Sequence, residues 1–179
     1  MEWTSDQDRI DWNVLSELYR VAPLGDKKPE DLKRAFANSM YKCFAFEEGM
    51  LAGAGRAVAD GVDCSYICDI AVHLRFQGRG LGKEIATRLR DLSRGHRKII
   101  LYANPGTEKF YERLGFRPML TAMAIFSDED AAIKKGLIAP PAHRTDQVVT
   151  GSVSSQTTSE ASHAGAQATS STRSSLPVL

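Results

Sequence analysis

A basic segment with regularly spaced glycines lies near the middle of the chain, directly after an apolar run. It contains Gly78, Gly80 and Gly82, with Arg79 and Lys83 beside them. Glycines at this spacing let backbone N–H groups approach an anion, and the N-terminus of a following helix adds the positive end of its dipole. The segment therefore predicts a phosphate-binding loop, although the same glycines also suit a turn that only joins a strand to a helix.

The three cysteines, Cys43, Cys64 and Cys68, show neither the spacing of a metal site nor clustering with histidine. Cys64 and Cys68 would share one face of a strand at a separation of about 13 Å, which is too far for a disulfide. We expect reduced, partly buried thiols and no bound metal ion.

Length and charge narrow the class of protein. The 179 residues suffice for one domain with a core, and the formal net charge is +1, from 23 basic and 22 acidic residues. This balance gives no overall attraction to nucleic acid or to an anionic membrane. No apolar run approaches the length of a transmembrane helix, and the acidic N-terminus is unlike a secretory signal. We expect a soluble, cytoplasmic protein without a nucleic-acid or membrane partner.

The elements before the glycine loop are two helices and three strands. Val14 and Leu18 belong to an apolar helical stripe, and a second helix begins at Pro29, a residue favoured in the first helical turn. Both helices should precede any strand. Turn signals at 48–49 and 60–61 then separate three runs of strand character, which predicts an antiparallel meander. The three strands are expected over residues 41–47, 50–59 and 64–72.

After the loop, Leu81, Ile85 and Leu89 form one apolar stripe, so the helix that carries them should pack on the sheet. The strand expected at 98–103 follows a helix directly and therefore suits a parallel partner for the strand at 64–72. The remaining predicted elements are a helix over 107–114 and one or two strands within 116–126. This order predicts an α+β domain with a mixed central sheet flanked by helices.

The C-terminal segment has the composition of a disordered tail. No Phe, Trp or Tyr follows Phe126, and fourteen of the 26 residues from 150 to 175 are Ser or Thr. Such a segment cannot bury enough apolar surface to offset the entropy of ordering it. We therefore expect a folded domain over residues 1–138, with a last surface helix within 128–137, and a disordered tail over 139–179.

A second block of residues accompanies the glycine loop further along the chain. It consists of Asn104 followed by a Phe-Tyr pair and a Gly-Phe pair within 110–116. The loop itself, Gln-Gly-Arg-Gly-Leu-Gly at 77–82, matches the form Gln/Arg-x-x-Gly-x-Gly/Ala. Together the two blocks resemble the GNAT superfamily of acyl-CoA-dependent N-acyltransferases. The resemblance covers residues 8–126 and implies the GNAT fold.

The resemblance implies where acetyl-CoA binds. The loop would hold the CoA pyrophosphate by backbone N–H groups, and the strand before it would pair with the pantetheine arm, with the Val72 N–H donating to the thioester oxygen. Asn104 would lie where two parallel strands separate. The residues assigned to acetyl-CoA are Ile70, Ala71, Val72, Gln77, Gly78, Arg79, Gly80, Leu81, Gly82, Lys83, Asn104 and Phe110.

Two residues are assigned to the chemistry by the same resemblance. Tyr111 would protonate the departing CoA thiolate, since a phenol with a pKa of about 10 is protonated at neutral pH. Asp69 would act as a general base through water, as the partner of the acceptor's ammonium group, or only as a structural carboxylate. No Cys–His pair indicates a covalent acyl-enzyme, so direct transfer in a ternary complex is expected.

The sequence is similar to glucosamine-6-phosphate N-acetyltransferases and to small arylalkylamine N-acetyltransferases. The former commonly carry an acidic residue where this chain has Cys68, so the acceptor stays open. We expect transfer of an acetyl group to the primary amine of a small molecule, namely an amino sugar, an arylalkylamine or a polyamine. A protein lysine or N-terminal acetyltransferase and a non-catalytic acyl-CoA-binding regulatory module are the alternatives. The resemblance also implies a homodimer formed through the C-terminal strands.

Overall fold

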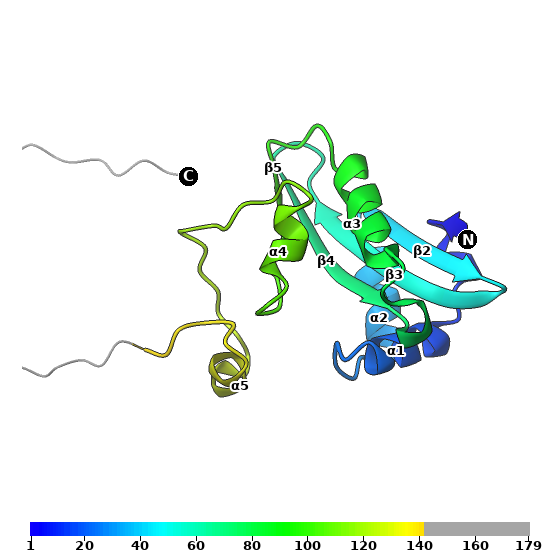
Figure 1. The fold of residues 1–179 in the computed structure, drawn as a ribbon, viewed down its shortest axis with the longest axis horizontal. Helices are drawn as coiled ribbons and strands as arrows, with labels where there is room; N and C mark the ends of the chain where they lie inside the picture. Colours follow the sequence, from blue (N-terminus) through cyan, green and yellow to red (C-terminus); the bar gives the residue numbers. More distant parts are fainter. Residues whose placement is uncertain (142–179) are drawn as a thin grey trace, which may run out of the picture. The chain divides into compact units, whose positions relative to one another are not determined.

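The computed structural model describes residues 1–141, which contain a five-stranded sheet with helices on both faces (Figure 1). The strands lie in the order β1-β2-β3-β4-β5, and neighbours are antiparallel except β4 and β5, which are parallel. Their bounds are β1 Glu2–Thr4, β2 Tyr41–Glu47, β3 Met50–Ala59, β4 Cys64–Val72 and β5 Lys98–Ile100. The α+β class, the antiparallel meander and the parallel last strand are confirmed.

β1 precedes both N-terminal helices, so the expectation that two helices come before any strand is wrong. Trp3 of β1 pairs with Ala45 of β2, and the guanidinium carbon of Arg88 lies 4.0 Å from the centre of the Trp3 ring. A strand of three residues is too short for an alternating pattern to reveal it. Pairing with β2 and the contact with Arg88 stabilise β1 only once the domain has folded.

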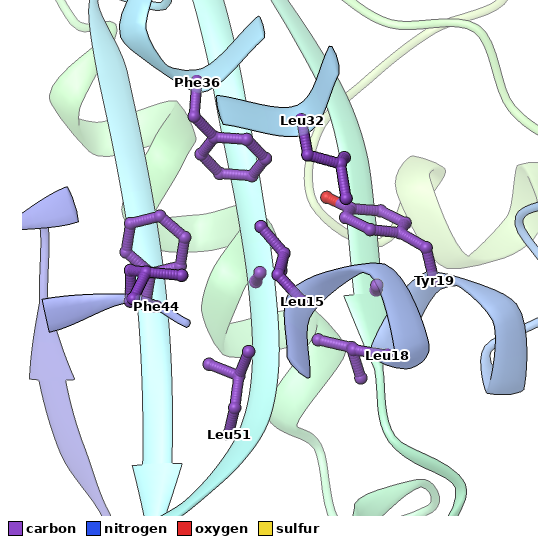
Figure 2. Close-up of a cluster of buried hydrophobic side chains, with 10 residues drawn as sticks. Leu15, Leu18, Tyr19, Leu32, Phe36, Phe44 and Leu51 are labelled. Atoms are coloured by element: carbon purple, nitrogen blue, oxygen red, sulfur yellow. The ribbon is translucent and has the colours of Figure 1, made fainter. Parts of the chain in front are cut away.

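Helices α1 (Trp12–Val21) and α2 (Pro29–Ala37) cover one face of the sheet. Asp11 caps α1 by accepting hydrogen bonds from two backbone N–H groups of its first turn. The apolar sides of both helices meet the sheet in one buried cluster (Figure 2). Its large members are Leu15, Leu18, Tyr19, Leu32, Phe36, Phe44 and Leu51. Each such side chain contributes about 1.5–3 kcal/mol on burial, so the cluster fixes α1 and the loop that follows it, residues 22–28, against the sheet.

Helix α3 (Leu81–Leu92) packs on the other face, and two glycines of β3 allow it to come close. A Cβ atom on Gly53 would lie 2.8 Å from Cδ1 of Ile85, and one on Gly55 would lie 2.7 Å from Cγ2 of the same side chain. A larger residue at either position would push the helix away from the sheet. The two glycines therefore set the distance between α3 and the sheet, and with it the position of the N-terminus of α3 at the end of β4.

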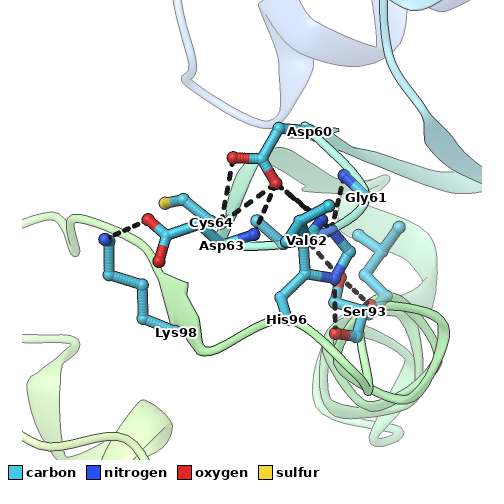
Figure 3. Close-up of polar contacts among 10 residues, drawn as sticks. Asp60, Gly61, Val62, Asp63, Cys64, Ser93, His96 and Lys98 are labelled. Carbon is cyan, nitrogen blue, oxygen red and sulfur yellow. Dashed lines mark hydrogen bonds and ion pairs between the residues drawn. The ribbon is translucent and has the colours of Figure 1, made fainter.

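A polar network ties the turn between β3 and β4 to the end of α3 (Figure 3). Asp60 accepts hydrogen bonds from backbone N–H groups of the turn, including that of Val62 at 2.8 Å, and these bonds lower the pKa of Asp60. The buried His96 ring links the two parts, because Nε2 accepts from the Gly61 N–H at 3.0 Å and Nδ1 lies 2.8 Å from the Ser93 carbonyl oxygen. The network holds the start of β4 beside β5.

After β5 the chain forms two short helices, α4 (Glu108–Glu112) and α5 (Glu129–Lys134), both shorter than expected. The strand or strands expected within 116–126 are not formed. There Leu120, Met123 and Ile125 are 95%, 98% and 102% exposed. Apolar residues form a strand only where a neighbouring strand edge receives them, and no strand pairs with this segment in the described part of the chain.

The expected disordered tail lies almost wholly outside the described residues, which end at Pro141. Within residues 1–141 all three cysteines are free, and no helix is long and apolar enough to cross a membrane. No group of three or more His, Cys, Asp or Glu side chains in this part of the chain is placed to hold a metal ion.

Candidate active site

A bulge interrupts β4 at Asp69 and Ile70, because only Gly55 of β3 lies opposite these two residues. Asp69 has a φ of 55°, in the left-handed region that residues other than glycine rarely adopt. The hydroxyl of Tyr19, a fully buried residue of α1, donates to the carbonyl oxygen of Asp69 at 2.6 Å. This hydrogen bond stabilises the strained conformation of β4 from the helical layer.

The bulge changes which side chains of β4 meet which face of the sheet. Before the bulge, Ile67 packs in the cluster under α3. After it, Ala71 packs in the cluster under α1 and α2, while Ile70 and Val72 pack against the α3 cluster. Strict alternation from Ile67 would place Asp69 on the α3 face. The extra residue instead leaves the Asp69 side chain on the α1 and α2 face, where its partners lie.

Two cations bind Asp69 on that face. Lys27, from the loop at 22–28, and Arg56 of β3 each contact one carboxylate oxygen, with Arg56 Nε 2.5 Å from Oδ2. Burial alone would raise the pKa of Asp69, but the hydrogen bonds and charges of Lys27 and Arg56 outweigh it and lower the pKa below its ordinary value. Asp69 is therefore held as a carboxylate. That state favours binding a cation and makes Asp69 a weak base.

β4 and β5 separate soon after they begin to pair. β5 pairs only with the first three residues of β4, ending at Tyr66, so the rest of that edge of β4 has no strand beside it in residues 1–141. The His73 N–H donates to the Ala52 carbonyl of β3 at 2.9 Å. Because hydrogen-bonded and non-bonded pairs alternate between antiparallel strands, the N–H of the preceding residue, Val72, points away from β3 and toward the gap.

The glycine loop joins this free edge to the start of α3. Gly78 and Gly80 have φ angles of 76° and 85°, which only glycine adopts at low cost. Gly80 is the N-cap of α3 and provides no side-chain cap, so the N–H groups of the first turn receive no partner within residues 1–141. The Gln77 side chain donates to the Val72 carbonyl at 3.0 Å and so ties the loop to β4.

The charged groups of the loop lie at its exposed rim. Nη1 of Arg79 lies 3.6 Å from Oε1 of Glu47 in β2, and the Arg79 guanidinium lies near the Phe76 ring. Lys83 is exposed on the first turn of α3. Open N–H groups with cations at the rim are suited to bind an anion. The residues that the resemblance assigns from Ile70 to Lys83 are thus continuous in space along β4, the loop and α3.

Tyr111 lies on α4, with its ring edge-on to Phe110 and Phe116 at centroid distances of 4.9 and 6.1 Å. Burial raises the pKa of Tyr111, so its phenol keeps a proton at neutral pH. The Asn104 carbonyl accepts from both the N–H and the hydroxyl of Thr107, which gives Asn104 a turn role as well. No hydrogen bond or ring contact joins Tyr111 to Asp69 or to the glycine loop among the described residues.

The residues that surround Asp69 could not all be predicted from the sequence. Tyr19 lies on the apolar stripe of α1 and cannot be told from an ordinary core residue by its spacing. Lys27 is one of two consecutive lysines in a loop. Arg56 does carry a signal, because it is the one charged residue of the apolar strand β3, and a charge in such a strand indicates a buried ion pair.

A stacked aromatic pair was not predicted from the sequence either. Tyr66 of β4 stacks on Tyr102 with ring centroids 6.2 Å apart and planes 15° from parallel. Tyr102 is 61% exposed, although it carries a large apolar ring. Burial, and then neighbouring Cys68, Tyr102 and Asp69, raise the pKa of Tyr66. Tyr66 lies three residues before Asp69 on the same strand.

Comparison with known proteins places this architecture among acetyltransferases. The acetyltransferase (GNAT) family matches residues 9–116. The protein called uncharacterized N-acetyltransferase ycf52-like, from Prochlorococcus marinus, is 35% identical over 113 residues, which are 60% of this chain and 63% of that protein. Serotonin N-acetyltransferase 2, chloroplastic, from Oryza sativa is 34% identical over 115 residues, which are 60% of this chain and 56% of that protein. The chain therefore spans about three-fifths of the length of these relatives.

Among solved structures, glucosamine-6-phosphate N-acetyltransferase from Arabidopsis thaliana matches with a TM-score of 0.54 and 22% identity, over 71% of this chain and 98% of that protein. At this identity the likeness concerns the fold alone. The family match over residues 9–116 takes in more than half of the chain and all of the elements from α1 to α4. By that match and that fold, the chain belongs to the GNAT acetyltransferase family.

Proposed function

We propose that this protein is an N-acetyltransferase that moves an acetyl group from acetyl-CoA directly to the primary amine of a small molecule. One observation carries the proposal: the free edge of β4 leads straight into a glycine loop and the open N-terminus of α3. A strand edge offers hydrogen bonds to the amides of a pantetheine arm, and a helix N-terminus binds a pyrophosphate. CoA carries these two groups in succession.

The loop and strand residues would bind and orient the cosubstrate. The N–H groups of Leu81, Gly82 and Lys83 would hold the pyrophosphate, with Arg79 adding charge at the rim. The Val72 N–H would donate to the thioester oxygen, where negative charge develops as the amine attacks. The direction of that N–H, away from β3 and into the gap, supports this role.

Tyr111 would donate its proton to the departing thiolate. Burial raises the pKa of Tyr111, so the phenol is protonated at neutral pH and can act as an acid. The state of Cys68 supports direct transfer without a covalent acyl-enzyme. Burial raises the pKa of that thiol to about 11, which leaves little thiolate to act as a nucleophile. Asp69, held as a carboxylate, is suited to bind the ammonium form of the acceptor. The ammonium would lose one proton to water before its nitrogen attacks the thioester, and the second proton that leaves the nitrogen would balance the one that Tyr111 gives to the thiolate.

The stacked pair of Tyr66 and Tyr102 favours an arylalkylamine over the other small amines. An exposed aromatic face near a carboxylate suits a ligand that carries both a ring and an ammonium group. The rice relative is named for serotonin, which has this chemistry. An amino sugar, a polyamine, a protein lysine or N-terminal amine, and CoA binding without turnover are the alternatives.

The test compares wild type with Tyr111→Phe and, as a control, Tyr41→Phe, which alters a tyrosine on β2. Acetyl-CoA consumption is measured with arylalkylamines, amino sugars, polyamines and peptides. We expect wild type to prefer arylalkylamines, and Tyr111→Phe to lower kcat by about 10²–10⁴ without weakening CoA binding. Tight CoA binding by a wild-type protein that acetylates none of these amines would show that the chain is a binding module.

Two further expectations stay predictions. A homodimer is supported by the exposure of Leu120, Met123 and Ile125, because exposed apolar side chains that follow closely in the chain are a feature of interaction surfaces. The cytoplasmic location has no support from the relatives, and the name of the rice protein contains the word chloroplastic.

A further inference from the structure

The two cations that bind Asp69 are held with different firmness. Arg56 lies within β3, its guanidinium donates to the buried hydroxyl of Ser39 at 3.1 Å, and its side chain is 16% exposed. Lys27 lies in the loop at 22–28, and its side chain is 30% exposed, nearly twice the value for Asp69. Arg56 is therefore a fixed part of the sheet, whereas the Lys27 ammonium reaches the carboxylate from the solvent side.

The Lys27 ammonium occupies a small cation site with two walls. One wall is the carboxylate of Asp69, and the other is the face of the Tyr19 ring, whose centroid is 4.7 Å from Nζ. A carboxylate and an aromatic face are the groups that proteins use to bind a primary ammonium. The site adjoins Ile70, the first residue of the strand segment assigned to acetyl-CoA.

We propose that Lys27 occupies the subsite for the acceptor's ammonium group, and that the acceptor enters by displacing Lys27 from Asp69 and the Tyr19 ring. The identity of the incoming cation rests on the proposed function. A lysine side chain ends in a primary ammonium, so it is a chemical copy of the protonated acceptor. Arg56 keeps one oxygen of Asp69 paired throughout, so the exchange never leaves the carboxylate without a cation.

The displacement makes Lys27 an internal competitor of the acceptor. The apparent affinity for the amine is the intrinsic affinity multiplied by the fraction of time that Lys27 is away from the site. The flexible stem of lysine regains rotamer freedom on release, which offsets part of the lost ion pair. Neutral molecules of the same shape gain nothing from the exchange, so the device selects for cations.

The test removes the competitor. Lys27→Met deletes the ammonium and keeps an unbranched side chain, and Lys27→Gln serves as a second variant. The matched control is Lys98→Met, which removes another lysine paired with an aspartate, Asp63, outside this cluster. With 2-phenylethylamine as acceptor, we expect Lys27→Met to lower the KM for the amine about tenfold, as when Lys27 fills the site about nine-tenths of the time. The KM for acetyl-CoA should stay unchanged in Lys27→Met, and the KM for the amine should stay unchanged in the Lys98→Met control. Adding Asp69→Asn to Lys27→Met should abolish the lowering of the KM for the amine.

A binding measurement separates this inference from the proposed function. CoA-loaded protein is titrated in a calorimeter with 2-phenylethylamine, which is an ammonium at pH 7.5, and with neutral 2-phenylethanol. Tighter binding of the amine alone by Lys27→Met supports the subsite, even if wild type acetylates no amine and the proposed function fails. If folded Lys27 variants bind the amine no more tightly than wild type, or bind the alcohol more tightly as well, the inference is overturned.

Discussion

The hydrogen bond from Tyr19 to the bulge gives the sharpest prediction. Tyr19→Phe removes one hydroxyl and keeps the ring that packs in the α1 and α2 cluster. The Asp69 carbonyl then loses a donor at 2.6 Å, inside a layer where the Tyr19 side chain is fully buried. An unsatisfied buried acceptor costs about 1–3 kcal/mol. We expect the free energy of unfolding to fall by that amount, since nothing else in the substitution changes volume or charge.

Tyr19→Phe should also lower kcat, through a shift of the β4 backbone. Asp69 keeps a φ of 55° only while its surroundings oppose relaxation, and a relaxed bulge would move the N–H groups of Ile70 and Val72. A shift of about 1 Å at a reacting centre costs roughly 100-fold, so a partial relaxation should lower kcat by roughly tenfold while CoA binding at the glycine loop is retained.

The assay is urea unfolding followed by circular dichroism, together with kcat and the Kd for CoA, for wild type, Tyr19→Phe and Tyr41→Phe. Tyr41 is a half-buried tyrosine whose ring lies edge-on to His96, and its hydroxyl makes no hydrogen bond within residues 1–141. A change in unfolding free energy within about 0.5 kcal/mol for Tyr19→Phe, the range of surface substitutions, would contradict a stabilising role of this hydrogen bond. Equal effects of both substitutions would contradict that role as well.

Two other predictions concern the carboxylate and the loop. Because the pKa of Asp69 is lowered in the folded protein, its stabilising effect is present above the unfolded pKa of about 3.9 and is lost as pH falls through the lower folded value. The difference in urea midpoint between wild type and Asp69→Asn should therefore be constant near neutral pH and narrow below about pH 4; a constant difference down to pH 2.5 would contradict the ion pairing. Gly80→Ala places a side chain at a φ of 85° at a cost of about 1–2 kcal/mol. Because Gly80 is the N-cap of α3, relief of this strain would displace the N–H groups proposed to hold the pyrophosphate, so CoA should bind roughly tenfold more weakly by calorimetry. Gly49→Ala, with a φ of 77° in the β2–β3 turn, carries the same strain and should leave CoA binding unchanged.

Local patterns were sufficient to predict most of the fold. The apolar stripe through Val14 and Leu18 and the turn signals at 48–49 and 60–61 act over a few residues, and the elements they predict are present, although Val14 itself is exposed. β1 and the segment at 116–126 were predicted wrongly for one shared reason. Whether a short or apolar segment becomes a strand depends on a neighbouring edge, which the segment's own residues do not encode.

In the candidate site, too, features set by neighbouring residues could be predicted and features set by distant residues could not. The loop at 77–83 was readable because glycines at positive φ are a local requirement of the backbone. The partners of Asp69 were not, since Tyr19 and Lys27 lie 50 and 42 positions away along the chain. The left-handed conformation of Asp69 itself was hidden, because a strand with an inserted residue has the same composition as one without.

The bulge in β4 also has a consequence for how this strand tolerates insertions and deletions. It acts as a change of phase: side chains before it and after it follow the same alternation, offset by one residue. Loss of Asp69 would remove the offset and leave Ile70, Ala71 and Val72 on the faces that they occupy now, because Cys68 and Ala71 would then be two positions apart and still lie opposite Arg56 and Ala54. A one-residue deletion at the bulge would thus spare the packing of β4 and remove only the carboxylate and its left-handed backbone, whereas a deletion elsewhere in β4 would exchange the inward and outward sides of the residues between it and the bulge. Sequence alignments of this region should therefore place a one-residue gap in β4 at the bulge.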